Sequence, residues 1–141
     1  MRRALNIDEA SFGPNHPSVS IRLSNLAQLL YSANRFAEAE PLRQRALAID
    51  ETTFGPVHPE VATDLNNLSQ LLKSVNRHAE AEPLMRRAWR ITLLSEKRNG
   101  HKHANHLSRK ERYTSILKAL GHTEDQIAAK FAEIQAEVEA D

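Results

Sequence analysis

Apolar residues recur along much of the chain at the spacing of one helix face. One stripe, with spacings i, i+4, i+7 and i+11, is formed by Val19, Leu23, Leu26 and Leu30. A second, with spacings i, i+3, i+7 and i+10, is formed by Ala39, Leu42, Ala46 and Ile49. Such spacings are typical of amphipathic helices. The small alanines of the second stripe would let two helices approach closely, so we expect an antiparallel helix pair.

The same pattern returns further along the chain. Residues 1–42 laid over residues 43–84 without a gap give 27 identical positions, so the period is 42 residues. A period of this size indicates stacked helix pairs, in which each unit buries its apolar face against the next. Residues 1–11 match the end of such a unit, and we therefore expect the chain to open with half a repeat.

Glycine, proline and asparagine mark the predicted helix boundaries. The turn Phe-Gly-Pro-Asn-His-Pro at residues 12–17 offers a left-handed helix end and then a proline suited to a first helical turn. Asn34 and Asn76 tolerate the left-handed backbone that a tight turn between helices requires. Pro41 and Pro83 fall about one turn inside the second helices, so we expect a bend there, unless those helices begin later.

The repeat decays after residue 91. A weaker stripe is formed by Tyr113, Ile116, Leu117 and Leu120. Thr123 and Gln126 then have the spacing of a capping box, which predicts a final helix. Its apolar face would hold Ile127, Phe131, Ile134 and Val138. We expect one domain over residues 1–141, divided into a half repeat (1–11), two repeats (12–53 and 54–95), a degenerate third (96–122) and a capping helix (123–141).

Composition narrows the class of protein. Nineteen basic and eighteen acidic residues leave a formal charge of +1, which argues against a dedicated nucleic-acid or membrane-surface protein. Cysteine is absent, no apolar run approaches the length of a membrane span, and the amino terminus lacks a signal peptide. No phosphate-binding glycine loop, zinc-protease motif or serine elbow occurs, and the four glycines lie at predicted helix ends. We expect a cytoplasmic, all-α solenoid without catalytic activity or cofactor.

Two octapeptides connect the chain to a known family. Leu-Ser-Asn-Leu-Ala-Gln-Leu-Leu (23–30) and Leu-Asn-Asn-Leu-Ser-Gln-Leu-Leu (65–72) are each followed by Ala-Glu-Ala-Glu-Pro-Leu. With the Phe-Gly-Pro-x-His-Pro turns, they resemble the 42-residue tetratricopeptide repeats of kinesin light chains and of many bacterial arrays. The resemblance is good over residues 1–91 and loose after them. It implies a concave groove that is lined by the first helices and binds an extended peptide, with Asn25 and Asn67 as the asparagines that bond the peptide backbone.

Helix geometry agrees with this assignment. Asn25 and Asn67 each follow a core leucine by two residues, about 200° around the helix, and so point away from the core. We expect the ligand groove to include Asn25, Gln28, Tyr31, Asn67, Gln70 and Lys73. The alternative is that they are ordinary solvated polar residues. Arg22 and Asp64 differ between the repeats, and they would either tune specificity or pair with each other across the repeat junction.

The sequence also allows other hypotheses about what the chain binds. The expected partner is a protein or peptide, but Leu5 and Ile7 of the opening half repeat could also bind a second copy, giving a homodimer. His101, His103 and His106 could bind a metal, although no fourth ligand is visible. The segment 97–112 holds six Lys or Arg residues and could contact a nucleic acid, but the lack of interleaved aromatics argues against single-stranded nucleic acid. Trp89, where the preceding repeat has Leu47, suggests local repacking.

Overall fold

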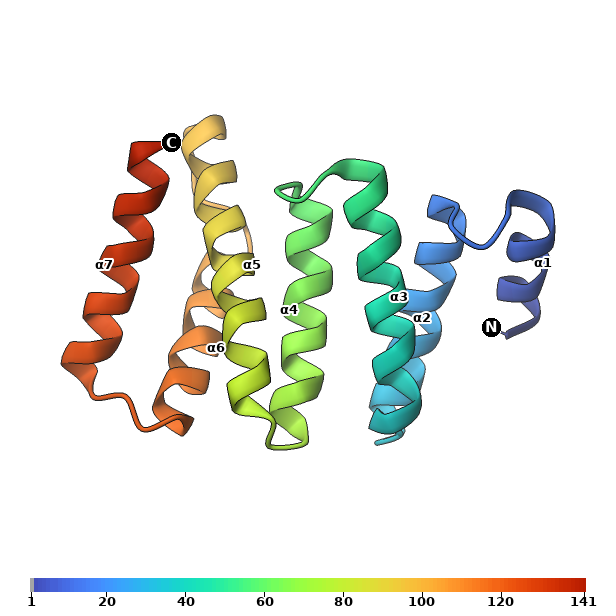
Figure 1. Cartoon of the computed structure of the whole chain (residues 1–141), viewed down its shortest axis with the longest axis horizontal. Coiled ribbons are helices and arrows are strands. Elements are labelled where there is room, and N and C mark those ends of the chain that lie inside the picture. The colour runs from blue at the N-terminus through green and yellow to red at the C-terminus, as the bar shows by residue number, and fades with distance from the viewer. Residues whose placement is uncertain (1) are drawn as a thin grey trace.

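The computed structural model describes residues 2–141 and is built of helices alone over this range (Figure 1). The helices are α1 (Arg2–Phe12), α2 (Pro17–Ser32), α3 (Phe36–Phe54), α4 (Pro59–Ser74), α5 (His78–Asn99), α6 (His106–Ala119) and α7 (Glu124–Ala140). The all-α class and the stack of helix pairs expected from the sequence are confirmed.

The helices stack in chain order. α2 packs against α3 and α4 against α5, and each pair lies against the next in an elongated row. We refer to α2, α4 and α6 as the first helices. α7 departs from this scheme because it packs mainly against α5 and makes few contacts with α6. In Figure 1 it forms the end of the row opposite α1.

The turns that precede α2 and α4 have the same geometry. Gly13 and Gly55 have φ of +88° and +90°, backbone angles that residues other than glycine rarely adopt. His16 Nδ1 then accepts a hydrogen bond from the backbone N–H of Ser18 at 3.1 Å and so caps α2. His58 does the same for α4, with the N–H of Glu60 at 3.0 Å. The turns therefore begin the helices as the sequence predicts.

The tight turns inside the pairs are also as predicted. Asn34 and Asn76 have φ of 61° and 62°. The helices that follow begin at Phe36 and His78, so Pro41 and Pro83 lie inside α3 and α5. The alternative that these helices begin later is therefore wrong. Both prolines are exposed, which keeps their rings away from the core.

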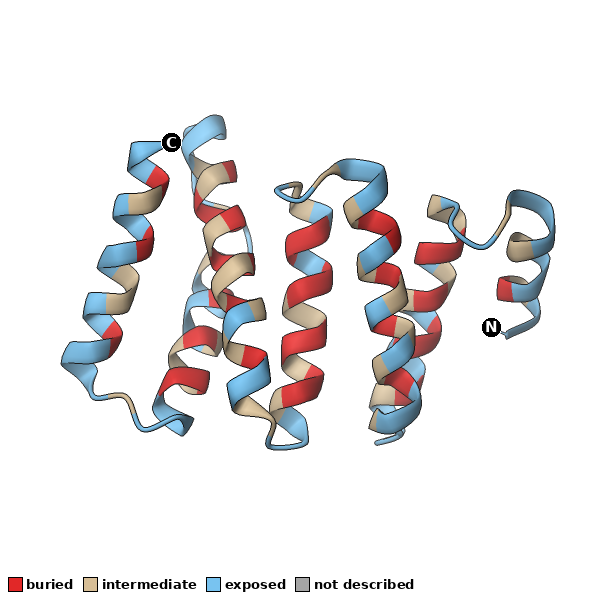
Figure 2. Cartoon of the chain, viewed as in Figure 1, coloured by how far each residue is buried: buried red, intermediate tan, exposed pale blue. Residues whose placement is uncertain are grey.

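The predicted stripes form the core (Figure 2). The buried members are Val19, Leu23, Leu26, Leu30, Ala39, Ala46, Ile49, Tyr113, Ile116, Leu117, Ile127, Ile134 and Val138. Leu42 and Phe131 are only half-buried and pack on the core from its edge. Leu120 is 38% exposed, so its inclusion in the stripe was wrong. It follows the end of α6 and serves as that helix's C-cap.

Hydrogen bonds and ion pairs fix α7 in place. The expected capping box is present: Thr123 Oγ1 accepts from the Gln126 N–H at 3.2 Å, and Gln126 Oε1 accepts from the Thr123 N–H at 2.8 Å. Along α5, Arg86 pairs with Glu137 at 2.8 Å, and Lys97 Nζ donates to the carbonyl oxygen of Val138 at 3.1 Å. A cation at a helix carboxyl end is favourable because that end carries partial negative charge. None of the helices over residues 2–141 has the length and apolar character needed to cross a bilayer.

Candidate functional site

Single side-chain contacts link consecutive first helices, although a second helix packs between them in the row, and we call the face that these side chains share the first-helix surface. Tyr31 of α2 reaches α4, where its hydroxyl lies 2.8 Å from Ser74 Oγ. Arg112 of α6 donates from Nη1 to Asn66 Oδ1 of α4 at 2.7 Å. Side chains from α2, α4 and α6 therefore meet in pairs along this surface.

Four of the six predicted groove residues are available to a ligand. Asn25 is exposed, and Asn67, Gln70 and Lys73 are half-buried. Their side chains form no hydrogen bond or ion pair with any other part of residues 2–141. Each amide retains a carbonyl acceptor and two N–H donors, the groups that a peptide backbone can pair with.

The other two groove residues are already engaged. Gln28 Oε1 accepts a hydrogen bond from Arg43 Nη2 at 3.0 Å. The Tyr31 ring lies 5.8 Å from the Arg43 guanidinium and makes an edge contact with Phe36, with ring centroids 5.2 Å apart. Gln28 and Tyr31 thus contact the buried Arg43 beneath the surface, and the amide N–H groups of the exposed Gln28 remain unused.

The surface continues onto α6, which the sequence analysis did not anticipate. His103 Nδ1 accepts the N–H of Asn105 at 3.0 Å, repeating the interaction of His58. His103 follows His58 by 45 residues, and the same offset places Arg112 in register with Asn67. The row Asn25, Asn67 and Arg112 therefore ends in a guanidinium. The sequence held a signal for this register: the offset of 45 residues exceeds the period of 42 by three, so three residues are inserted before His103. The same shift has to be applied to the whole of the next helix.

Two polar side chains lie at the equivalent position of three junctions between consecutive repeats, which we number first (α1 with α2), second (α3 with α4) and third (α5 with α6). At the first junction Arg22 Nε bonds Asp8 Oδ2 at 3.0 Å. At the third, Arg109 Nη1 donates to Thr92 Oγ1 at 2.9 Å. At the second, the corresponding residues are Asp50 and Asp64, two carboxyl groups that are each 7% exposed.

This arrangement corrects the expected pairing of Arg22 with Asp64. Each of them turns instead toward the helix that precedes its own, since helices in the row contact their sequence neighbours. Burial, and then the adjacent carboxyl of Asp50, raise the pKa of Asp64 to about 9. Two neighbouring carboxylates cannot both ionise cheaply, so the pair retains a proton at neutral pH.

Arginines under the surface are also strongly desolvated. Arg43 is 4% exposed and Arg109 is 3% exposed, and burial lowers the pKa of both. Arg43 Nε and Arg109 Nε have no hydrogen-bond partner. Burial likewise lowers the pKa of the half-buried Arg112. The middle of the first-helix surface therefore has positive charge close beneath it.

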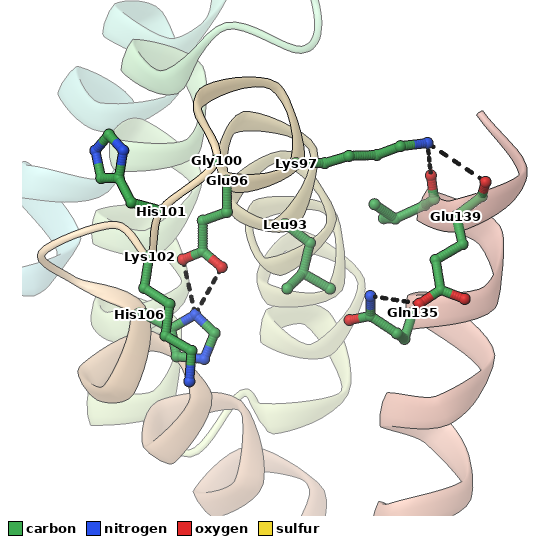
Figure 3. Close-up of a pocket in the computed structure, with 10 residues that line it drawn as sticks. Leu93, Glu96, Lys97, Gly100, His101, Lys102, His106, Gln135 and Glu139 are labelled. Atoms are coloured by element: carbon green, nitrogen blue, oxygen red, sulfur yellow. Dashed lines mark hydrogen bonds and ion pairs between the residues drawn. The ribbon is translucent and has the colours of Figure 1, made fainter.

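The basic segment 97–112 does not form one patch. Lys97 binds α7, Arg109 is buried and Arg112 binds α4, so three of its six cations have structural partners. Its histidines also diverge: His103 bonds the Asn105 N–H just before α6, and His106 Nδ1 lies 2.7 Å from Glu96 Oε2 (Figure 3). Within residues 2–141, no three His, Asp or Glu side chains are grouped as metal ligands would be.

The end of the row at α1 exposes apolar side chains. Ile7 is 55% exposed and Leu29 is 56% exposed. The residues one period later, Ile49 and Leu71, are 3% and 0% exposed because helices on both sides cover them. Leu5, which the sequence analysis grouped with Ile7, is buried inside the first junction.

Comparison with known proteins agrees with the geometry. The sequence profile of the Tetratricopeptide repeat family matches residues 1–52 and 23–92. No curated protein sequence matches the chain. Among solved structures, BtubC (BKLC) from P. vanneervenii is similar with a TM-score of 0.76 and 22% identity, over 99% of this chain and 54% of that one.

Two structures of the nearly identical TPR-like repeats of a putative kinesin light chain from Podosopora anserina are also similar. Their TM-scores are 0.69 and 0.66 at 18% identity, over 97% of this chain. The chain spans 54% of the length of BtubC and 64% of the length of each of the two kinesin light chain structures. Stacked helix pairs, the repeated turns and the matching profile lead to one conclusion: the chain belongs to the tetratricopeptide repeat family and has repeats like those of kinesin light chains.

Proposed function

We propose that the chain is a protein-interaction scaffold that binds an extended polypeptide segment along the first-helix surface. The observation that carries this proposal is the row of Asn25 and Asn67, which occupy the same position on consecutive first helices and have no partner within residues 2–141. Amides spaced in this way can pair with a peptide main chain whatever its side chains are. Gln70, Lys73 and Arg112 extend the same surface and would discriminate between segments.

The first test replaces both asparagines. We expect Asn25→Ala with Asn67→Ala to reduce partner binding about tenfold or more, since each lost hydrogen bond is worth about 0.5–1.5 kcal/mol. Stability should change by less than about 0.5 kcal/mol, because neither side chain bonds within the chain. Partners would be captured with the wild-type chain, identified, and then titrated against both proteins by calorimetry.

The matched control is Asn6→Ala with Gln44→Ala, two exposed amides on α1 and α3. This control should bind a captured partner as the wild type does. Partners that bind the asparagine double variant and the control equally well would show that the first-helix surface is not used.

A second candidate function is self-association through the end of the row at α1. Ile7 and Leu29 are exposed there, whereas Ile49 and Leu71, one period later, are covered by a neighbouring helix pair. The helices that cover Ile49 and Leu71 indicate the kind of surface that would fit this face. A second copy could supply it through a twofold contact, the commonest arrangement in soluble oligomers.

Light scattering over a concentration series tests this contact. We expect a weak dimer that Ile7→Glu dissociates, since a carboxylate would be buried against an apolar surface. Leu5→Glu is unsuitable because Leu5 is in the core and its loss would disturb folding. Asn6→Glu, on the same helix, is the control. A monomer at every concentration, for all three proteins, would argue against self-association.

A further inference from the structure

In each helix pair, one face of the first helix packs against the second helix that follows it. The corresponding face of α6 is not covered by a following helix. In the preceding first helix, Ala62, Leu65 and Ser69 are each fully buried. The residues 45 positions later are Leu107, Lys110 and Thr114; Leu107 is 65% exposed, Lys110 is exposed and Thr114 is half-buried. Because α7 packs mainly on α5, it leaves this face of α6 uncovered.

A cleft follows the seam between α6 and α7. One cavity of about 440 Å³ is lined by residues that include Lys110, Ile127, Ala128 and Phe131. Lys110 and Phe131 also line a second cavity of about 270 Å³, which extends to Trp89. This second cavity shares Leu93, His106 and Gln135 with a third of about 640 Å³ near the loop after α5, shown in Figure 3.

The inner wall of the cleft is aromatic and contains an unused donor. Trp89 makes edge contacts with His106 and Phe131, with ring centroids 4.9 and 5.6 Å apart. It is 3% exposed, and its Nε1 is buried without a hydrogen-bond partner. A buried indole N–H normally has an acceptor. Trp89 lines this cavity, and a ligand oxygen would reach its Nε1 once the side chains that cover this atom shift.

The cleft also carries an unneutralised cation. Lys110 occupies the position of the core residue Leu65, and its Nζ lies 5.6 Å from the centre of the Phe131 ring. Within residues 2–141 it pairs with no carboxylate. Glu96 is already paired with His106, and Glu124 lines only the outer cavity. Negative charge is therefore favoured near Lys110, whereas farther out in the cavity Glu124 offsets the charge of Lys118.

We propose that the cleft between α6 and α7 binds a small amphipathic carboxylate, either an acyl or an aryl acid. The carboxylate accepts from Trp89 Nε1 and pairs with Lys110 where the two inner cavities join. The apolar part lies along Ile127, Ala128 and Phe131. This site is independent of the peptide-binding proposal, because it lies where α6 faces α7, whereas the first-helix surface includes the part of α6 that contacts α4.

Trp89 is the only tryptophan of the chain and reports on the site directly. Sodium decanoate would be titrated below its micelle concentration while the indole ¹H–¹⁵N resonance and the tryptophan fluorescence are recorded. We expect a saturable shift. Lys110→Met, which retains the apolar stem, should weaken decanoate binding about tenfold, and decanol should bind the wild type about tenfold more weakly than decanoate.

Two further variants complete the experiment. Lys73→Met removes a lysine outside the cleft and should leave decanoate binding unchanged. Ala128→Leu fills the cavity from an exposed position on α7 and should weaken binding without removing a core residue. The proposal is overturned by an indole resonance that does not shift, by equal decanoate binding to wild type and Lys110→Met, or by undiminished binding to Ala128→Leu.

Discussion

Replacing Leu71 with alanine is expected to cost about 2–5 kcal/mol of unfolding free energy, the range measured for fully buried leucines in other proteins. Leu71 is 0% exposed and packs with the core of the preceding helix pair, although it belongs to α4. Its truncation would leave a cavity at the junction between α3 and α4, where the two halves of the row meet. Urea unfolding followed by circular dichroism would measure the loss.

The repeat supplies the control for this experiment. Leu29 has the same place in α2 but is 56% exposed, so Leu29→Ala should change stability by no more than about 0.5 kcal/mol in dilute solution, where a weak dimer is dissociated. The two substitutions are chemically identical and differ only in what covers the side chain. A large cost for Leu29→Ala at this dilution would contradict the exposure of Leu29 in the single chain.

Replacing Asp64 should have the opposite sign and should depend on pH. Burial and the neighbouring Asp50 raise the pKa of Asp64 to about 9 in the folded chain, while an unfolded aspartate titrates near pH ~3.9. Between these values the folded state holds a proton that the unfolded state has released. The group's contribution to stability is therefore complete below about pH 4 and is lost as pH rises toward 9, by up to about 1.4 kcal/mol per pH unit.

Asp64→Asn should remove this dependence, because an amide can donate to Asp50 without taking up a proton. We expect it to stabilise the chain by about 1–3 kcal/mol at pH 8, where the wild type keeps a buried and partly unsatisfied carboxyl group. Asp64→Arg should act in the same direction, since it recreates the pair of Asp8 with Arg22. Arg43 and Glu60 also face Asp64, with opposing effects on its pKa.

Urea unfolding from pH 6 to 9.5 would record the difference between variant and wild type. Asp125→Asn, at an exposed position on α7, is the control and should follow the wild-type profile. Parallel profiles for Asp64→Asn and the wild type would show that the pair does not share a proton.

The sequence was sufficient for much of the fold because the determining interactions are local. Gly13, Asn34 and Thr123 fix helix boundaries through backbone conformation and nearby hydrogen bonds, and each was identified from residue type and spacing. The helical stripes were equally clear, since a period of 42 residues shows each apolar position twice. Leu120 was misplaced because the apolar pattern continued past the end of α6.

Interactions between helices were harder to predict. Arg22 and Asp64 looked complementary along the sequence, yet each packs against the preceding helix, which residue spacing does not reveal. The residue type and repeat position of Gln28 predict a free groove residue, but its side chain accepts a hydrogen bond from Arg43 of another helix. Position in a repeat tells which way a side chain points. It does not tell which atoms it meets, because Arg43 is replaced by Met85 one period later.

Contacts in this molecule run almost entirely between helices that are neighbours in the row. Such a chain closes only short loops as it folds, so it has little of the entropic delay that distant pairings impose. If force were applied to the two ends of the described segment, residues 2 and 141, we expect its helices to detach one at a time, with α1 and α7 first, since each is covered on one side only within this segment. The helices in the middle of the row, α3 to α5, would detach last, so under tension these residues would lengthen in steps that begin at both ends of the row.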